Sequence, residues 1–123
     1  MTNQQLPLWR RQANSFHYAA EGVVDLLCNQ PHAQFHALAT ALVIVAGLVA
    51  KLSRAEWCLL ILSITLVWVA EALNTAVEYV TDLASPEIHP LAKKAKDVAA
   101  GAVLCAALGA AAIGLIIFWS HFF

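Results

Sequence analysis

The chain has 123 residues, which fits a single domain. Hydrophobic residues make up 61% of it and charged residues 12%, whereas an ordinary soluble domain carries about 25% charged residues. Together with a mean hydropathy of +0.70, this favours a membrane protein over a soluble helical bundle. The net charge of -1, with no basic patch, gives no indication of nucleic-acid binding. Three scattered cysteines without a C-x-x-C pair argue against a disulfide framework or a structural zinc site.

The N-terminal region predicts a surface helix. Residues 1–13 are polar and show no cleavable signal peptide. Across residues 14–28 the apolar side chains share one broad side of a helix, and His17, Glu21 and Asp25, spaced by four, line the other. Such a helix is too polar to cross a bilayer, so we expect it to lie at the membrane surface.

Three apolar stretches predict membrane spans at about residues 33–50, 56–84 and 97–120. Pro31 is suited to the first turn of the first span. A short charged turn precedes the second, and a loop over residues 85–97 with two prolines and three lysines precedes the third. The expected fold is an all-α membrane protein with three transmembrane helices and one N-terminal amphipathic helix.

Basic residues predict the orientation of these spans. The N-terminus and the second loop share one side of the membrane, and the turn between the first two spans lies on the other side. The first side carries more lysine and arginine residues, so it is expected to be cytoplasmic. Those residues are Arg10, Arg11, Lys93, Lys94 and Lys96, against Lys51 and Arg54 on the other side.

A polar stripe interrupts the second span. Glu71, Asn74, Glu78 and Asp82 fall within roughly 80° of one another on a helix that turns about 100° per residue. Carboxylates on an otherwise apolar helix are costly and mark a functional site. Spacing alone leaves open whether Glu71 is a catalytic group, the partner of a lysine, or part of an ion or proton relay.

Depth distinguishes the members of this stripe. If the second span enters the bilayer at Trp57, Glu71 lies roughly 7 Å inside the cytoplasmic edge, and Glu78 and Asp82 reach the headgroups. Lys96 and Asp97 return to the same level. The arrangement suits the joining of a lipid hydroxyl to a soluble phosphate donor.

Two other patterns carry less information. His32 and His36 have the i,i+4 spacing of metal ligands, but without a third ligand a capping or surface role is the better interpretation. The sequence contains no Walker loop and no glycine-rich nucleotide motif.

The motif E-A-L-N-T-A-V-E-Y-V-T-D over residues 71–82, followed by H-P-L-A-K-K-A-K-D-V-A-A-G-A-V over residues 89–103, closely resembles the prokaryotic diacylglycerol kinase and undecaprenol kinase family. The resemblance includes S-F-H-Y-A-A-E-G near the N-terminus and extends from about Arg11 to the end of the chain. It implies a small membrane kinase, active as a homotrimer, that transfers the γ-phosphoryl group of Mg-ATP to a lipid alcohol. Its active sites would lie between subunits, facing the cytoplasm of a bacterial inner membrane.

The resemblance also implies roles for individual residues. Glu71 matches the catalytic base, and Glu78 and Gln30 match the ligands of Mg²⁺. The lipid-substrate positions are Arg11, Glu71, Asn74 and Ala100. The ATP-binding positions are Arg11, Tyr18, Gln30, Glu78, Glu87, Ile88, His89, Lys96 and Asp97.

Gln30 departs from the family pattern, because many members carry a glutamate there. An amide oxygen can still bind Mg²⁺, although without a charge. The sequences H-P-L-A-K and Q-F-H look more like the undecaprenol kinase branch, so undecaprenol is favoured over diacylglycerol as substrate. A diacylglycerol kinase is the alternative, and a proton or ion relay or a membrane assembly protein is the non-enzymatic one.

Overall fold

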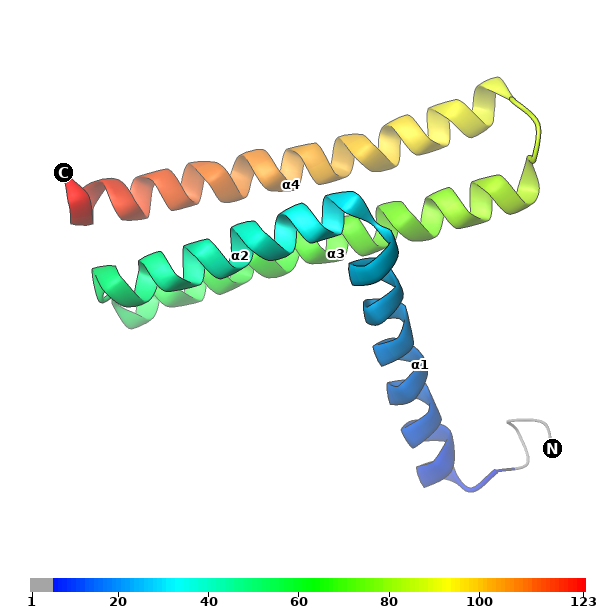
Figure 1. The fold of residues 1–123 in the computed structure, drawn as a ribbon, viewed down its shortest axis with the longest axis horizontal. Helices are drawn as coiled ribbons and strands as arrows, with labels where there is room; N and C mark the ends of the chain where they lie inside the picture. The colour runs from blue at the N-terminus through cyan, green and yellow to red at the C-terminus, as the bar shows by residue number, and fades with distance from the viewer. Residues whose placement is uncertain (1–5) are drawn as a thin grey trace.

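A computed structural model of the chain describes residues 6–123 and contains four helices and no strand in that range. Helix α1 spans Leu8–Asn29, α2 spans Pro31–Ala50, α3 spans Arg54–Ala84 and α4 spans Pro90–Phe122. Helices α2, α3 and α4 run side by side, whereas α1 leaves the bundle at a steep angle (Figure 1). The all-α fold with three long apolar helices and one further N-terminal helix is confirmed.

The three bundle helices are each long and apolar enough to cross a membrane. Most of their leucine, isoleucine and valine side chains are exposed, as expected for surfaces that face lipid rather than water. Helices α3 and α4 pack most extensively, and α2 touches both less closely. Because α2 is shorter than its neighbours, α3 and α4 continue beyond the corner between α1 and α2 (Figure 1).

Two helices begin earlier than the sequence pattern predicted. Helix α1 starts at Leu8 rather than at residue 14, directly after Pro7. Helix α4 starts at Pro90 rather than at residue 97, and the Nδ1 atom of His89 accepts a hydrogen bond from the Leu91 N–H at 3.2 Å. Proline fits the first turn of a helix, where its missing N–H has no intrahelical role. The loop expected over residues 85–97 is therefore only residues 85–89, and the lysines belong to α4.

The end of the bundle farthest from α1 is firmly packed. Leu52, Leu60 and Ile117 form a small apolar cluster there. The first turn of α3 carries a capping box, in which Ser53 and Glu56 bond each other's backbone N–H groups. The Oε1 atom of Glu56 also lies 2.9 Å from Nε2 of His121 in the last turn of α4. This contact joins the N-terminal end of α3 to the C-terminal end of α4.

Candidate active site

The polar stripe of α3 is buried where it begins. Glu71 is only 2% exposed, and Asn74 and Thr75 are also buried. Buried carboxylates and amides require polar partners, since an unpaired polar group in an apolar environment is costly. The partners come from α2 and from the stripe itself.

The partner of Glu71 across the bundle is His36 of α2. The Nε2 atom of His36 lies 3.7 Å from Oε2 of Glu71, and both side chains are largely shielded from solvent. The surface or capping role expected for His36 is therefore wrong. This pairing could not be predicted from the sequence, because it depends on how α2 and α3 are aligned.

Asn74 links the buried part of the stripe to its more exposed part. Its Nδ2 group donates a hydrogen bond of 3.2 Å to Oε1 of Glu78. Its Oδ1 atom is buried and accepts no hydrogen bond from any of residues 6–123. Asn74 therefore fixes the Glu78 carboxylate and still offers one oxygen to a donor or a cation.

Farther along α3, the stripe meets α4. Asp82 forms an ion pair with Lys96, and Lys93 forms another with Asp97 at 2.5 Å. Lys96 is thus held beside the stripe. Asp97 instead pairs with a lysine one turn earlier on its own helix.

A second polar cluster joins α1 to α3 at the corner. The Tyr79 hydroxyl donates to Oδ2 of Asp25 at 2.7 Å, and Asn29 Nδ2 donates to Oδ1 of the same carboxylate at 2.6 Å. Gln30 Nε2 in turn donates to the Tyr79 hydroxyl at 3.3 Å. The hydrogen bond from Tyr79, followed by that from Asn29, holds the pKa of Asp25 below its usual value. Gln30 thus contacts Tyr79, the residue that follows Glu78 on α3.

Other predicted site residues are not gathered around Glu71 within this one chain. Tyr18 is exposed on α1, which points away from the bundle, and Arg11 lies farther along the same helix, where its Nε donates to the Leu6 carbonyl (Figure 1). The turn that holds Glu87, Ile88 and His89 is exposed, as is Ala100 on α4.

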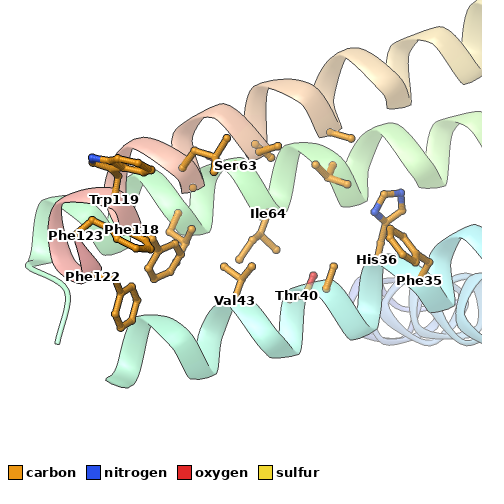
Figure 2. Close-up of a pocket in the computed structure, with 18 residues that line it drawn as sticks. Phe35, His36, Thr40, Val43, Ser63, Ile64, Phe118, Trp119, Phe122 and Phe123 are labelled. Atoms are coloured by element: carbon orange, nitrogen blue, oxygen red, sulfur yellow. The ribbon is translucent and has the colours of Figure 1, made fainter. Parts of the chain in front are cut away.

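An elongated apolar cavity of about 680 Å³ opens between α2, α3 and α4. Figure 2 shows His36 and Phe35 at one end of it and the aromatic side chains of Phe118, Trp119 and Phe122 at the other. The lining residues with side-chain nitrogen or oxygen atoms are His36, Thr40, Ser63 and Trp119. A cavity of this shape suits a hydrocarbon chain whose polar end lies near His36, the partner of Glu71.

The described residues fit a metal ion that is carried by a nucleotide better than a protein-only metal site. No group of three or more His, Cys, Asp or Glu side chains in residues 6–123 is close enough to hold a metal. The Glu78 carboxylate and the Asn74 side chain, whose Oδ1 has no partner among residues 6–123, lie near one another on α3. Mg²⁺ in phosphate-transferring sites commonly takes only one or two protein carboxylates, together with phosphate oxygens and water.

Comparison with known proteins identifies the family. The family model described as prokaryotic diacylglycerol kinase matches residues 17–118. The chain is 42% identical over 104 residues to an undecaprenol kinase of Bacillus subtilis, covering 85% of each chain. It is 33% identical over 105 residues to a diacylglycerol kinase of Escherichia coli, covering 85% of this chain and 86% of that one. It is also 42% identical over 101 residues to a diacylglycerol kinase of Synechocystis, covering 81% of this chain and 58% of that one. The chain therefore belongs to the prokaryotic diacylglycerol kinase family of lipid kinases.

Proposed function

We propose that this protein transfers the γ-phosphoryl group of Mg-ATP to the hydroxyl of a membrane lipid alcohol, with undecaprenol favoured over diacylglycerol. The observation that carries the proposal is the position of Glu71. Its carboxylate is buried beside the end of an apolar cavity and is followed along one helix by an amide, a second carboxylate and a lysine ion pair. An apolar cavity that suits a lipid therefore lies next to polar groups that suit a nucleotide phosphate.

Membrane depth supports this division of roles. The Asp25–Tyr79 hydrogen bond fixes the level at which α1 leaves the bundle. Glu71 precedes Tyr79 by eight residues on α3. If α1 lies on the membrane surface, Glu71 is therefore about 12 Å deeper than Tyr79, at 1.5 Å per residue. Asp82 and Lys96 then lie on the aqueous side of the membrane surface. A lipid hydroxyl can reach Glu71 while a soluble nucleotide approaches Asp82 and Lys96.

In the proposed reaction, Glu71 takes the proton of the lipid hydroxyl. The lipid oxygen forms a bond to the γ-phosphorus, and the bond between that phosphorus and the oxygen of ADP breaks. Phosphoryl transfer of this kind needs little covalent chemistry from the protein, so alignment and charge neutralisation provide most of the catalysis. Asn74 holds Glu78 in place, and Lys96 supplies positive charge to the phosphates.

Glu78 is the proposed ligand of the Mg²⁺ that ATP carries, with Gln30 as a second ligand. When bound, this ion neutralises charge on the transferring phosphates. Lys96 and Asp97 face the phosphates, and Glu87, Ile88 and His89 lie beside the nucleoside. Arg11 and Tyr18 reach the nucleotide from α1, and Ala100 and Arg11 contact the lipid.

We further propose that the active form is a homotrimer in the bacterial inner membrane, with its sites facing the cytoplasm. The position of Tyr18, exposed on a helix that points away from its own bundle, supports sites that are shared between subunits. The membrane orientation is supported by the excess of Lys and Arg on the side of α1 and the α3–α4 turn.

The preference for undecaprenol rests on the branch-specific sequences and on the 42% identity to the undecaprenol kinase of Bacillus subtilis over most of both chains. Diacylglycerol kinase relatives match at 33% and 42% identity, so diacylglycerol is the alternative substrate.

A transfer assay tests the proposal. Purified protein in mixed micelles receives labelled ATP and either lipid, and labelled lipid phosphate is measured. Transfer should occur, faster with undecaprenol, and Glu71→Gln should lower its rate by about 100-fold or more. Glu21→Gln, which changes an exposed glutamate on α1, is the matched control and should leave the rate unchanged.

Three results would count against the proposal. No transfer by the wild-type protein to any lipid alcohol would favour an ion relay or an assembly role. A Glu71→Gln variant with the wild-type rate would remove Glu71 as the base. Faster transfer to diacylglycerol would reverse the proposed lipid preference.

A further inference from the structure

His36 is a partly buried titratable residue that has no role in the proposed reaction as described so far. It belongs to α2, whereas the acidic stripe belongs to α3, and its Nε2 atom faces the Glu71 carboxylate at 3.7 Å. This is about 1 Å longer than a charge-assisted hydrogen bond. Catalytic hydrogen bonds are often long before substrate binds and shorten in the reactive complex.

The reaction creates a problem that His36 can solve. Each transfer to an alcohol releases one proton, which the proposed function puts on Glu71. The Glu71 side chain is 3% exposed, so water has little access to it. Until that proton leaves, Glu71 cannot accept another, and the next turnover is blocked.

The surroundings leave few other acceptors. On α3, Asn74 donates to Glu78 and carries no titratable group. The α4 residues that line the same cavity carry no titratable side chain, among them Ala107 and Ala110. At the end of α1, Asp25 is engaged by Tyr79 and Asn29. Histidine is a common proton shuttle in proteins, and the His36 imidazole lies beside the Glu71 carboxylate.

We propose that His36 is a positioning residue that holds the Glu71 carboxylate and carries away the proton that Glu71 takes from the lipid hydroxyl. This inference rests on the proposed function. The lipid oxygen gains the phosphoryl group, ADP leaves, and the proton passes from the Glu71 carboxyl to the neutral imidazole. His36 is 15% exposed, five times as much as Glu71, so it is the more accessible of the two groups to a further proton acceptor.

The test compares His36→Gln with the wild-type enzyme in the micelle assay, with the lipid that the wild type accepts. Glutamine keeps much of the size and the hydrogen bonding but cannot carry a proton. We expect kcat to fall by about tenfold or more, while the KM values for ATP and lipid change less than about twofold. His32→Gln, one turn earlier on α2 and exposed, is the matched control and should behave as the wild type.

Chemical rescue separates proton transfer from a structural role. In His36→Ala, added imidazole should restore a large part of kcat, because the truncated side chain leaves space at the end of the open cavity. Pyrazole has the same size but is not basic at neutral pH, and it should restore nothing.

Several outcomes would overturn the inference alone while the kinase activity stands. They are a normal kcat in His36→Gln, a change confined to KM, no rescue by imidazole, or equal rescue by pyrazole. Absence of transfer by the wild-type enzyme would overturn the proposed function, and this inference with it.

Discussion

Asn74 is a buried side chain whose hydrogen bonding is incomplete. It donates to Glu78, yet its own Oδ1 is buried without a hydrogen-bond partner among residues 6–123. A buried acceptor without a partner costs about 1–3 kcal/mol. Retaining such a group is understandable if a substrate or an ion completes it during the reaction.

Replacing Asn74 by leucine should therefore separate stability from activity. Asn74→Leu removes the unpartnered oxygen, so thermal stability in detergent should stay the same or rise. It also removes the donor to Glu78, a hydrogen bond to a charged group worth about 1.5–3 kcal/mol, so the transfer rate should fall roughly 10- to 100-fold. Thermal unfolding and phosphoryl transfer measure the two effects. An unchanged rate would show that Asn74 does not orient the site.

Gln30 gives a second prediction at the scale of one residue. Gln30→Glu would place a charge where the family commonly has one, so the Mg²⁺ concentration that gives half the maximal rate should fall several-fold. The measurement is a magnesium titration of the transfer rate. Gln12→Glu adds the same charge at an exposed position of α1 and should leave the titration unchanged. An unchanged titration in Gln30→Glu would mean that residue 30 is not near the metal.

The sequence predicted the alignment of the polar stripe better than the partners of its residues. The stripe from Glu71 to Asp82 follows from helical spacing alone, and the structure aligns it as expected. The contacts of Glu71 with His36 and of Asp25 with Tyr79 could not be predicted, because they join different helices. Such contacts depend on the alignment of helices, which no local pattern encodes.

Among the elements, α1 depends on few contacts for its position. Its attachment to α3 includes the hydrogen bond from Tyr79 to Asp25, and a hydrogen bond from Asn29 supports the same carboxylate. These bonds favour the ionised carboxylate, which is why the pKa of Asp25 is lowered. The angle of α1 should therefore be sensitive to acid.

The direction of this pH dependence follows from the lowered pKa of Asp25. The ionised group stabilises the attachment above its usual pKa of 3.8, and this contribution is lost as the pH falls from there through the lower pKa of the folded protein. Spin labels at Gln12→Cys and Leu83→Cys in a cysteine-free chain should show a broader distance distribution in that acid range. Tyr79→Phe should broaden it already at neutral pH. A Tyr79→Phe distribution as narrow as that of the wild type would show that other contacts hold α1.

Helix packing gives another prediction at a glycine of α2. A Cβ atom on Gly47 would lie 2.8 Å from Cη2 of Trp57 and 3.1 Å from Cδ1 of Leu52. Since neither the indole ring nor the packed leucine can move freely, Gly47→Ala should destabilise the fold by about 1–3 kcal/mol. Gly22→Ala, where a Cβ would meet nothing within 4 Å, is the control and should be neutral or stabilising. Thermal unfolding in detergent measures both, and equal stability would contradict the prediction.

Helix boundaries were harder to predict than helices. Apolar periodicity locates the buried or lipid-facing part of a helix, but the short mixtures of apolar and charged residues in the first turns of α1 and α4 carry no such signal. Pro7 and Pro90 were the available signals, since proline commonly stands at or just before the start of a helix.

At the scale of the whole molecule, the proposed orientation makes opposite ends of the bundle accessible from opposite sides. In a cysteine-free chain in intact cells, Glu87→Cys in the α3–α4 turn should resist a membrane-impermeant thiol reagent. Arg54→Cys at the start of α3 should react with it. In lysed cells, Glu87→Cys should react with the reagent as well. The reverse pattern would invert the proposed topology.

Two polar contacts between α3 and α4, Glu56 with His121 and Asp82 with Lys96, stand 26 residues apart on α3. At 1.5 Å per residue they mark a fixed span of about 39 Å, more than the hydrocarbon thickness of about 30 Å in a typical bilayer. The distance between these two contacts is fixed, so the thickness of the host membrane determines which part of the span lies in water. Shorter or longer acyl chains would move the headgroup plane along α3 and α4, whereas Glu71 keeps its position in the protein. The turnover rate should therefore pass through a maximum at one bilayer thickness.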